Sequence, residues 1–296
     1  MADQLWTSPR TGYRRKGTRF ADLRALVEAG ITARAILEPL WSCPADANGV
    51  EVRHILVEMG FDVVGVQEHK HGPVIGFVEG GSLQEGRVKD HLQPMTANLL
   101  IADATPLPIV LSVMKSKERT FVLAGPEVGG IVTRADLNKP PVRVYLFGMI
   151  SLLEMHLTFW LKEGYPNDSW SGELPPTRLE KAQKLLADRR SRRQDTGLLE
   201  CLQFCDKRDL ILGRPILRDK LGAEPKAKAH QFLKRAEALR DLLAHSQKDL
   251  DHGSSWEEVI DLVEWVEEFL HRSDELVEME ARDVAGEHPD ALWGST

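Results

Sequence analysis

The first half of the sequence contains an internal repeat with a period of 54 to 55 residues. Proline, methionine, glycine and leucine recur in the same order, and the spacing shortens by one residue between the methionine and the glycine. A turn between a helix and the strand that follows it can absorb that difference. The matched pairs are Pro39 and Pro94, Met59 and Met114, Gly76 and Gly130, and Leu83 and Leu137. A repeat of this length indicates one supersecondary unit present twice.

Each copy shows a helical pattern followed by two strand patterns. Residues 52–60 and 108–116 carry apolar residues at helical spacing. Shorter runs rich in β-branched residues follow, joined by the turns HKHG and GPE. The strand segments are 62–68 and 73–79 in the first copy, and 119–125 and 128–133 in the second. We therefore expect an extended entry, a helix, two strands and an exit helix in each copy.

The most specific stretch of the repeat is GIVTRADL, residues 130–137. Together with the repeat, it resembles the CBS (cystathionine-β-synthase) domain, which normally occurs as a pair. The resemblance covers roughly residues 21–140. It implies a Bateman pair of βαββα units that takes an adenine nucleotide (AMP, ADP or ATP) as a regulatory ligand, and it implies no other cofactor.

The signature suits a nucleotide chemically. A hydroxyl and a carboxylate three residues apart, at a strand end and a helix start, can bind ribose and phosphate, and a helix N-terminus adds free N–H groups. The resemblance implies that Asp136 accepts hydrogen bonds from the ribose and that Thr133 lies near sugar or phosphate. It places adenine against the entry segment, here residues 101–107. The expected nucleotide-binding residues are Gly130, Ile131, Thr133 and Asp136.

The first copy departs from this signature. Its equivalent is GFVEGGSL, with Glu79 in place of the threonine and Ser82 in place of the aspartate. Because a carboxylate would repel a phosphate, we expect one competent site rather than two. The alternative is that Thr-x-x-Asp only caps a helix, which stabilises it by roughly 1 kcal/mol, and that the pair is a dimerisation module.

The second half of the sequence shows helical patterns only. After Pro140 and Pro141 the strand signals end, and an up-and-down helical bundle is expected. The expected helices are 142–163, 177–193, 197–212, 225–247 and 255–282. The predicted fold class is therefore α+β, a CBS pair followed by an all-α bundle. The predicted boundaries are a flexible arm at 1–20, the pair at 21–140, the bundle at 141–282 and a flexible tail at 283–296.

The bundle carries the stretch RDLLAHS, residues 240–246, within the helix expected at 225–247. Helical spacing places Phe232, Ala236, Leu239 and Leu243 on one apolar face. Arg240 lies at the edge of that face, whereas Asp241 and His245 lie away from it, one turn apart. Packing of this helix against the core of the monomer therefore does not account for the presence of His245, and a solvent-exposed helix face is the simplest interpretation.

Arg-x4-His in an all-helical domain resembles the HEPN (higher eukaryotes and prokaryotes nucleotide-binding) domain, over roughly residues 142–280. Many members are metal-independent endoribonucleases whose motifs meet in a dimer. The resemblance implies Arg240, Asp241 and His245 as catalytic residues. His245 would be the general acid or base, Arg240 would stabilise charge on the phosphate, and Asp241 would orient the imidazole.

The remaining features bear on partners. The net charge is −7, so RNA contact would need a local basic patch. The cluster ADRRSRRQ provides one, although such a run is more often a solvated helix end. Its arginines are Arg189, Arg190, Arg192 and Arg193. Three cysteines form no disulfide framework and residues 1–17 contain no signal-peptide core, so we expect a cytoplasmic protein. No residue spacing indicates a metal site. Glu154 and His156 lie in the apolar stretch 144–161 and argue against a membrane span there.

The sequence therefore supports two hypotheses. In the first, the CBS pair senses an adenine nucleotide and controls a homodimeric endoribonuclease, in a stress, toxin or phage-defence response. In the second, the chain is a non-catalytic nucleotide sensor or dimeric interaction module with a regulatory protein partner. Both include a homodimer formed through the CBS and helical parts. In the first, RNA is the substrate.

Overall fold

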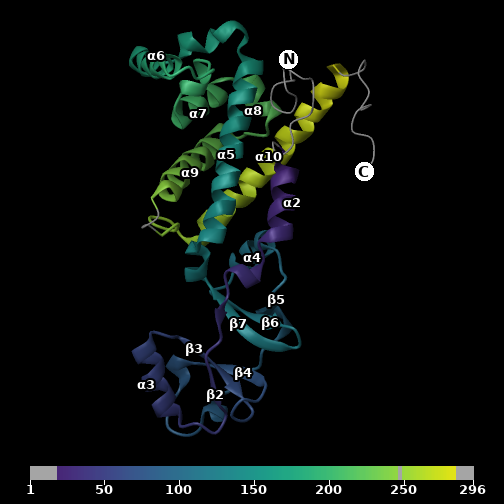
Figure 1. Ribbon diagram of the computed structural model, residues 1–296, viewed down its shortest axis with the longest axis vertical. Helices are drawn as coiled ribbons and strands as arrows, with labels where there is room; N and C mark the ends of the chain where they lie inside the picture. The colour runs from purple at the N-terminus through teal and green to yellow at the C-terminus, as the bar shows by residue number, and fades with distance from the viewer. Residues whose placement is uncertain (1–18, 246–248, 285–296) are drawn as a thin grey trace. The chain divides into compact units, whose positions relative to one another are not determined.

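The computed structural model describes residues 19–245 and 249–284, in two compact units (Figure 1). One unit comprises residues 27–142. The other, the helical unit, combines residues up to 26 with residues from 143 onward. The boundary falls inside helix α2 (Phe20–Gly30) and near the start of helix α5 (Pro140–Gly164). Most of the expected arm at 1–20 and tail at 283–296 lies outside the described residues.

Residues 27–142 hold two copies of one α+β arrangement. In each copy a short strand runs parallel to the next strand, a helix connects the two, and an antiparallel hairpin follows. The first copy contains β1 (Glu38–Pro39), β2 (Ser42–Pro44), α3 (Gly49–Met59), β3 (Val63–Gln67) and β4 (Val74–Glu79). The second contains β5 (Leu100–Ala102), α4 (Leu107–Met114), β6 (Arg119–Ala124) and β7 (Glu127–Thr133).

The two copies exchange their entry segments. Strand β1 pairs antiparallel with β7, which belongs to the other copy, with Glu38 opposite Ile131. The second entry segment does the same in reverse, because Gln93 bridges Phe77 on β4. The rings of Phe77 and Phe121 then meet at 4.9 Å between centroids, within the apolar cluster that joins the copies. The repeat therefore folds as one unit with approximate two-fold symmetry.

The repeated glycines lie where these entry segments pass. A Cβ on Gly76 would lie 2.5 Å from the carbonyl oxygen of Gln93, and a Cβ on Gly130 would lie 3.2 Å from that of Glu38. Each glycine also adjoins a β-bulge in its hairpin, where the register shifts by one residue. A Cβ would clash with the backbone at Gly76 and would be tightly crowded at Gly130, which explains why glycine recurs in both copies.

One of the matched pairs is not equivalent in the structure. Met114 is fully buried, whereas Met59 is 45% exposed. Helix α3 has eleven residues and α4 has eight, so matching their last residues brings different faces into register. The inward positions of α3 are Val52 and Leu56, and they correspond to Val110 and Met114 of α4. The methionine match was therefore wrong by about one turn.

The described residues of the helical unit contain no strand. Its helices α5, α6, α7, α9 and α10 correspond to the five expected stretches, and most ends agree within three residues. The exception is the start of the stretch expected at 197–212, because α7 begins only at Phe204 and residues 199–201 form a separate 3-10 helix. The short helix α8 was not predicted, because Arg214 is extended and Pro215 starts a new helix. The bounds are α6 (Pro176–Ser191), α7 (Phe204–Gly213), α8 (Pro215–Lys220), α9 (Lys226–Ala244) and α10 (Trp256–Val284).

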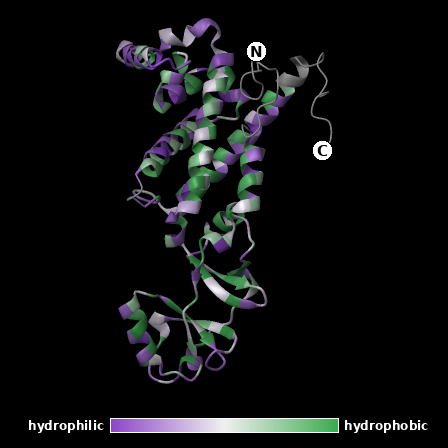
Figure 2. Cartoon of the chain, viewed as in Figure 1, coloured by the Kyte–Doolittle hydropathy of each residue, from purple (hydrophilic) through white to green (hydrophobic). Residues whose placement is uncertain are grey.

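Helix α5 is long and apolar enough to cross a membrane, judged by length and composition alone. Of its most apolar stretch, 61% is buried within the protein, as in the core helix of a bundle. Figure 2 shows hydrophobic residues along most of α5, whereas α9 and α10 carry hydrophobic and hydrophilic residues side by side. Its buried polar groups have partners on α10, because Trp160 Nε1 donates to Ser273 Oγ at 2.6 Å and Tyr145 Oη donates to Glu267.

Candidate functional site

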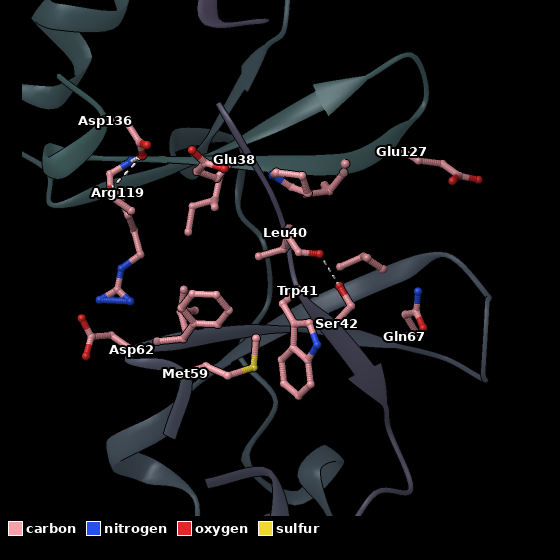
Figure 3. A pocket seen from close by; sticks show the side chains of 18 of the residues that line it. Glu38, Leu40, Trp41, Ser42, Met59, Asp62, Gln67, Arg119, Glu127 and Asp136 are labelled. Atoms are coloured by element: carbon pink, nitrogen blue, oxygen red, sulfur yellow. Dashed lines mark hydrogen bonds between the residues drawn. The ribbon is translucent and has the colours of Figure 1, made fainter. Parts of the chain in front are cut away.

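A cavity of about 1480 Å³ opens among residues of both copies in the unit 27–142 (Figure 3). The side from the first copy carries the apolar side chains of Leu40, Trp41 and Met59, together with polar ones such as Asp62 and Gln67. The side from the second copy carries Arg119 and Asp136. A cavity that combines apolar side chains with a few polar groups is typical of a small-molecule site.

The signature residues lie on the side from the second copy. Ile131 and Thr133 at the end of β7, and Asp136 in the next turn, all line the cavity. Gly130 does not line it, because its role is to pack against the entry segment. The prediction that Thr133 and Asp136 share one site therefore agrees with their positions, and their nucleotide contacts stay a prediction.

In the structure, Asp136 caps the turn that begins at Thr133. Its Oδ2 accepts hydrogen bonds from the backbone N–H of Thr133 at 2.7 Å and from the Thr133 hydroxyl at 2.9 Å. The turn is a five-residue 3-10 helix, Arg134–Asn138, not the longer exit helix expected. The expected contribution from a helix N-terminus therefore finds no support. Instead, the capping pattern considered as an alternative is present in the structure.

Asp136 can accept further hydrogen bonds besides the two that cap the turn. The carboxylate is almost fully buried, and its Oδ1 lies 2.9 Å from the ammonium of Lys139. Burial alone lowers the pKa of Lys139, but its bonds to Asp136 and Glu38 outweigh this effect and raise that pKa. Since an ionised carboxylate offers about four lone-pair positions, Oδ1 retains room for a ligand hydroxyl.

The wall expected to hold adenine differs from the observed one. Residues 101–107 do not line the cavity, whereas the first entry segment, from Glu38 to Ser42, does. The reason is the exchange of entry segments, which brings β1 of the first copy alongside β7 of the second. A repeat in the sequence does not reveal that exchange.

The signature positions of the first copy are arranged differently. The hydroxyl of Ser82 donates to the carbonyl of Glu79 at 2.8 Å. The Glu79 carboxylate lies 3.0 Å from Arg119 of the second copy. Neither Glu79 nor Ser82 lines the cavity. These positions agree with the expectation of one competent site.

The RDLLAHS stretch lies at the C-terminal end of α9 in the helical unit. The helix ends at Ala244, so the expected extension to residue 247 was wrong, and residues 246–248 lie outside the described part of the chain. His245 is the residue after the helix, with an extended backbone, and it is exposed. Asp241 is exposed as well. Both face away from the core, as predicted, but His245 is no longer held one helical turn from Asp241.

Arg240 has partners within the bundle. Its guanidinium lies 3.4 Å from Glu154 on α5 and 5.7 Å from the ring centre of Phe204. Glu154 also accepts from Lys207 at 2.8 Å, and Lys207 is buried. From the sequence, Glu154 counts only against a membrane span, and this link between α5, α7 and α9 is not predicted. Nothing in a single sequence pairs residues 154, 207 and 240.

The basic cluster lies at the end of α6. Arg190, Arg192 and Arg193 are exposed, and Arg189 is partly buried with a bond to the carbonyl of Glu200. Arg192 pairs with Asp188, so one of the four charges is partly neutralised. Within residues 19–245 and 249–284, no group of three or more histidine, cysteine or acidic side chains could hold a metal ion.

Comparison with known proteins gives a likeness in the N-terminal part. No family model and no curated protein matches the chain. Solved structures do match. They include CBS-pair proteins. CBSX2 from Arabidopsis thaliana is 20% identical, covering 40% of this chain and 95% of its own, with a TM-score of 0.33. CBSX2 in complex with AMP is 18% identical, covering 39% and 98%, with a TM-score of 0.34.

A bacterial relative gives the same result. The CBS domain of the CNNM/CorC family Mg²⁺ transporter in complex with ATP is 13% identical, covering 40% of this chain and 92% of its own, with a TM-score of 0.33. TM-scores this low do not transfer a ligand or an activity to this chain. These matches leave the HEPN-type prediction for the helical part untested.

Proposed function

We propose that residues 27–142 form a nucleotide sensor that binds an adenine nucleotide in the cavity between the two copies. The observation that carries this proposal is that Thr133 and Asp136 line the same cavity as the apolar side chains of Leu40 and Trp41. Apolar side chains suit the base, and a hydroxyl with a carboxylate suits the sugar and phosphate.

Calorimetric titration with AMP, ADP, ATP and adenosine tests this function. The expected result is saturable binding of at least one nucleotide, weakened about tenfold by Asp136→Asn, since hydrogen bonds to a charged group contribute about 1.5–3 kcal/mol. Ser82→Ala, at the equivalent position of the first copy, is the matched control and should leave binding unchanged. If no adenine compound binds the wild-type protein, the sensor proposal is wrong.

The second part of the proposal is that the helical unit is a dimeric, metal-independent endoribonuclease controlled by the sensor. What favours it is that Asp241 and His245 are exposed, and that Arg240, 3.6 Å from Asp241, keeps a partly exposed side chain. His245 would take the proton of an RNA 2′-hydroxyl while the oxygen attacks phosphorus, and the 5′-oxygen would leave with a proton from an acid. The products would be a 2′,3′-cyclic phosphate and a 5′-hydroxyl.

A homodimer is part of this second proposal. Helix α5, which carries Glu154, exposes Val144, Phe147 and Met155 at helical spacing, with 65%, 54% and 42% of these residues accessible. A second copy covering this face would bring two RDLLAHS stretches closer together. The alternative is a non-catalytic sensor that uses the same face for a regulatory protein partner.

RNA cleavage with and without adenine nucleotides distinguishes the two. We expect wild-type protein to cleave, His245→Ala to lose at least a hundredfold in rate, and His230→Ala, an exposed histidine on the same helix, to retain activity. If all three proteins cleave RNA equally, or if none cleaves it, the endoribonuclease proposal is wrong and the non-catalytic sensor remains. Light scattering on the same samples measures whether the protein is a dimer.

A further inference from the structure

Arg119 occupies a position in the cavity that the nucleotide signature does not account for. It is the first residue of β6, and it pairs directly with Thr133 on β7. Directly paired residues of antiparallel strands project their side chains to the same face of a sheet. The guanidinium of Arg119 and the hydroxyl of Thr133 therefore line the same wall, and both line the cavity.

The guanidinium is only partly satisfied. Its Nη2 donates to Oε1 of Glu79 at 3.0 Å. Its Nη1 is buried, and among the described residues no acceptor lies within hydrogen-bond distance of it. Figure 3 shows the guanidinium directed into the cavity, on the side where Asp62 also lies. A buried cationic donor without an acceptor is costly, so its presence beside a cavity points to an anionic ligand.

The partner of Arg119 is the residue that breaks the signature in the first copy. Glu79 ends β4, at the position that Thr133 holds in the second copy. The Arg119–Glu79 pair therefore joins the two copies. Glu79 is 46% exposed, and pairs of this exposure contribute little to stability. A ligand anion could therefore replace Glu79 as the partner of Arg119.

We propose that Arg119 is the phosphate-binding residue of the cavity and that Glu79 is its intramolecular competitor. This inference rests on the proposed nucleotide sensor and specifies how the phosphate is recognised. A phosphate carries more charge than a carboxylate and can accept two parallel bonds from the planar guanidinium. A bound nucleotide satisfies Nη1 and draws Nη2 away from Glu79. Binding thereby breaks one bond between the copies, and a ligand without a phosphate leaves that bond intact.

The test compares AMP with adenosine by calorimetric titration of the full chain. Arg119→Gln should weaken AMP about 10- to 100-fold, because a charge-assisted bond is lost, and should leave adenosine unchanged. Glu79→Gln should strengthen AMP about two- to fivefold, because the competitor is removed, and again leave adenosine unchanged. Opposite effects of two neighbouring substitutions are not expected from a general loss of folding.

An exposed pair elsewhere in the same unit supplies matched controls. Arg87 lies 2.9 Å from Asp46, and neither residue lines the cavity. Arg87→Gln and Asp46→Asn should leave both affinities unchanged. Thermal melting of every variant shows that each one is folded.

The outcomes separate this inference from the sensor proposal. If neither AMP nor adenosine binds any of the proteins, the sensor proposal fails, and the competition with it. If AMP binds the wild-type protein but Glu79→Gln binds it no more tightly, the competition is refuted and the sensor stands. If Arg119→Gln weakens the binding of adenosine as much as the binding of AMP, Arg119 maintains the shape of the cavity and does not bind the phosphate.

Discussion

Asp274 is a buried carboxylate in the helical unit whose titration should make the stability of that unit depend on pH. It lies on α10, and its Oδ2 accepts a hydrogen bond from the backbone N–H of Phe20 at 2.8 Å, at the start of α2. Its Oδ1 is buried without a hydrogen-bond partner among the described residues, and His156 Nε2 lies 3.7 Å from it. Burial raises the pKa of Asp274 to about 7, against an ordinary value of 3.8.

The charges around Asp274 act in both directions. Arg19 and the N–H groups of Phe20 and Ala21 lower its pKa, whereas Asp22 raises it, but burial is the largest effect. The folded protein thus holds the Asp274 proton up to about pH 7, and the unfolded chain releases it near pH 4. Stability from this group is complete below pH 4 and is lost as the pH rises through 7. Between pH 5 and pH 8 the loss is about 2 to 3 kcal/mol.

Asp274→Asn removes this titration while keeping an acceptor for the Phe20 N–H. We expect the free energy of unfolding of the wild-type protein to fall by about 2 to 3 kcal/mol more than that of the variant between pH 5 and pH 8. Urea denaturation followed by tryptophan fluorescence measures this difference, and Trp160 reports on the same cluster through Ser273. Glu275→Gln, an exposed neighbour, is the control. Parallel pH profiles for wild type and Asp274→Asn would refute the burial argument.

Two further predictions concern the unit 27–142. Gly76→Ala should destabilise it by about 1 to 3 kcal/mol in urea denaturation, because the new Cβ would lie 2.5 Å from a backbone oxygen, whereas Gly81→Ala, with open space around it, should cost far less. Burial raises the pKa of the Cys43 thiol to about 11, so maleimide should label the native protein at Cys205, which is partly exposed, well before Cys43. Mass spectrometry of labelled peptides measures the order, and equal labelling rates would contradict it.

The sequence predicted the local elements of the repeat because local patterns determine them. Runs rich in β-branched residues located both hairpins, and the glycine-containing signature located the end of β7. The exchange of entry segments was not predictable, because it depends on a contact between residues 38 and 131 that no local pattern contains. The methionine match failed for a related reason. Helical spacing identifies an apolar face, but it does not show where a helix of different length begins.

The same distinction applies to the candidate sites. Thr133 and Asp136 were found because one short motif holds both, and Arg240 and His245 for the same reason. Glu154 and Arg119 were missed, since each reaches its partner across the fold, 86 residues away for Glu154 with Arg240 and 40 for Arg119 with Glu79. The signal for Arg119 was nevertheless present in part. It is the first residue of the strand that pairs with the signature, where a cation could lie near a bound phosphate.

The contact of Glu79 with Arg119 changes how Glu79 is interpreted. From the sequence, a carboxylate at the threonine position of the first copy only removes a ligand site. In the structure, the same carboxylate pairs with Arg119 of the second copy, so it also partly neutralises a cation that lines the cavity. An exposed ion pair contributes at most about 1 kcal/mol, so Glu79 can lower the affinity for a phosphate by only about fivefold. In the proposed sensor, a competitor of that strength would permit nucleotide binding and would still couple binding to a change between the copies.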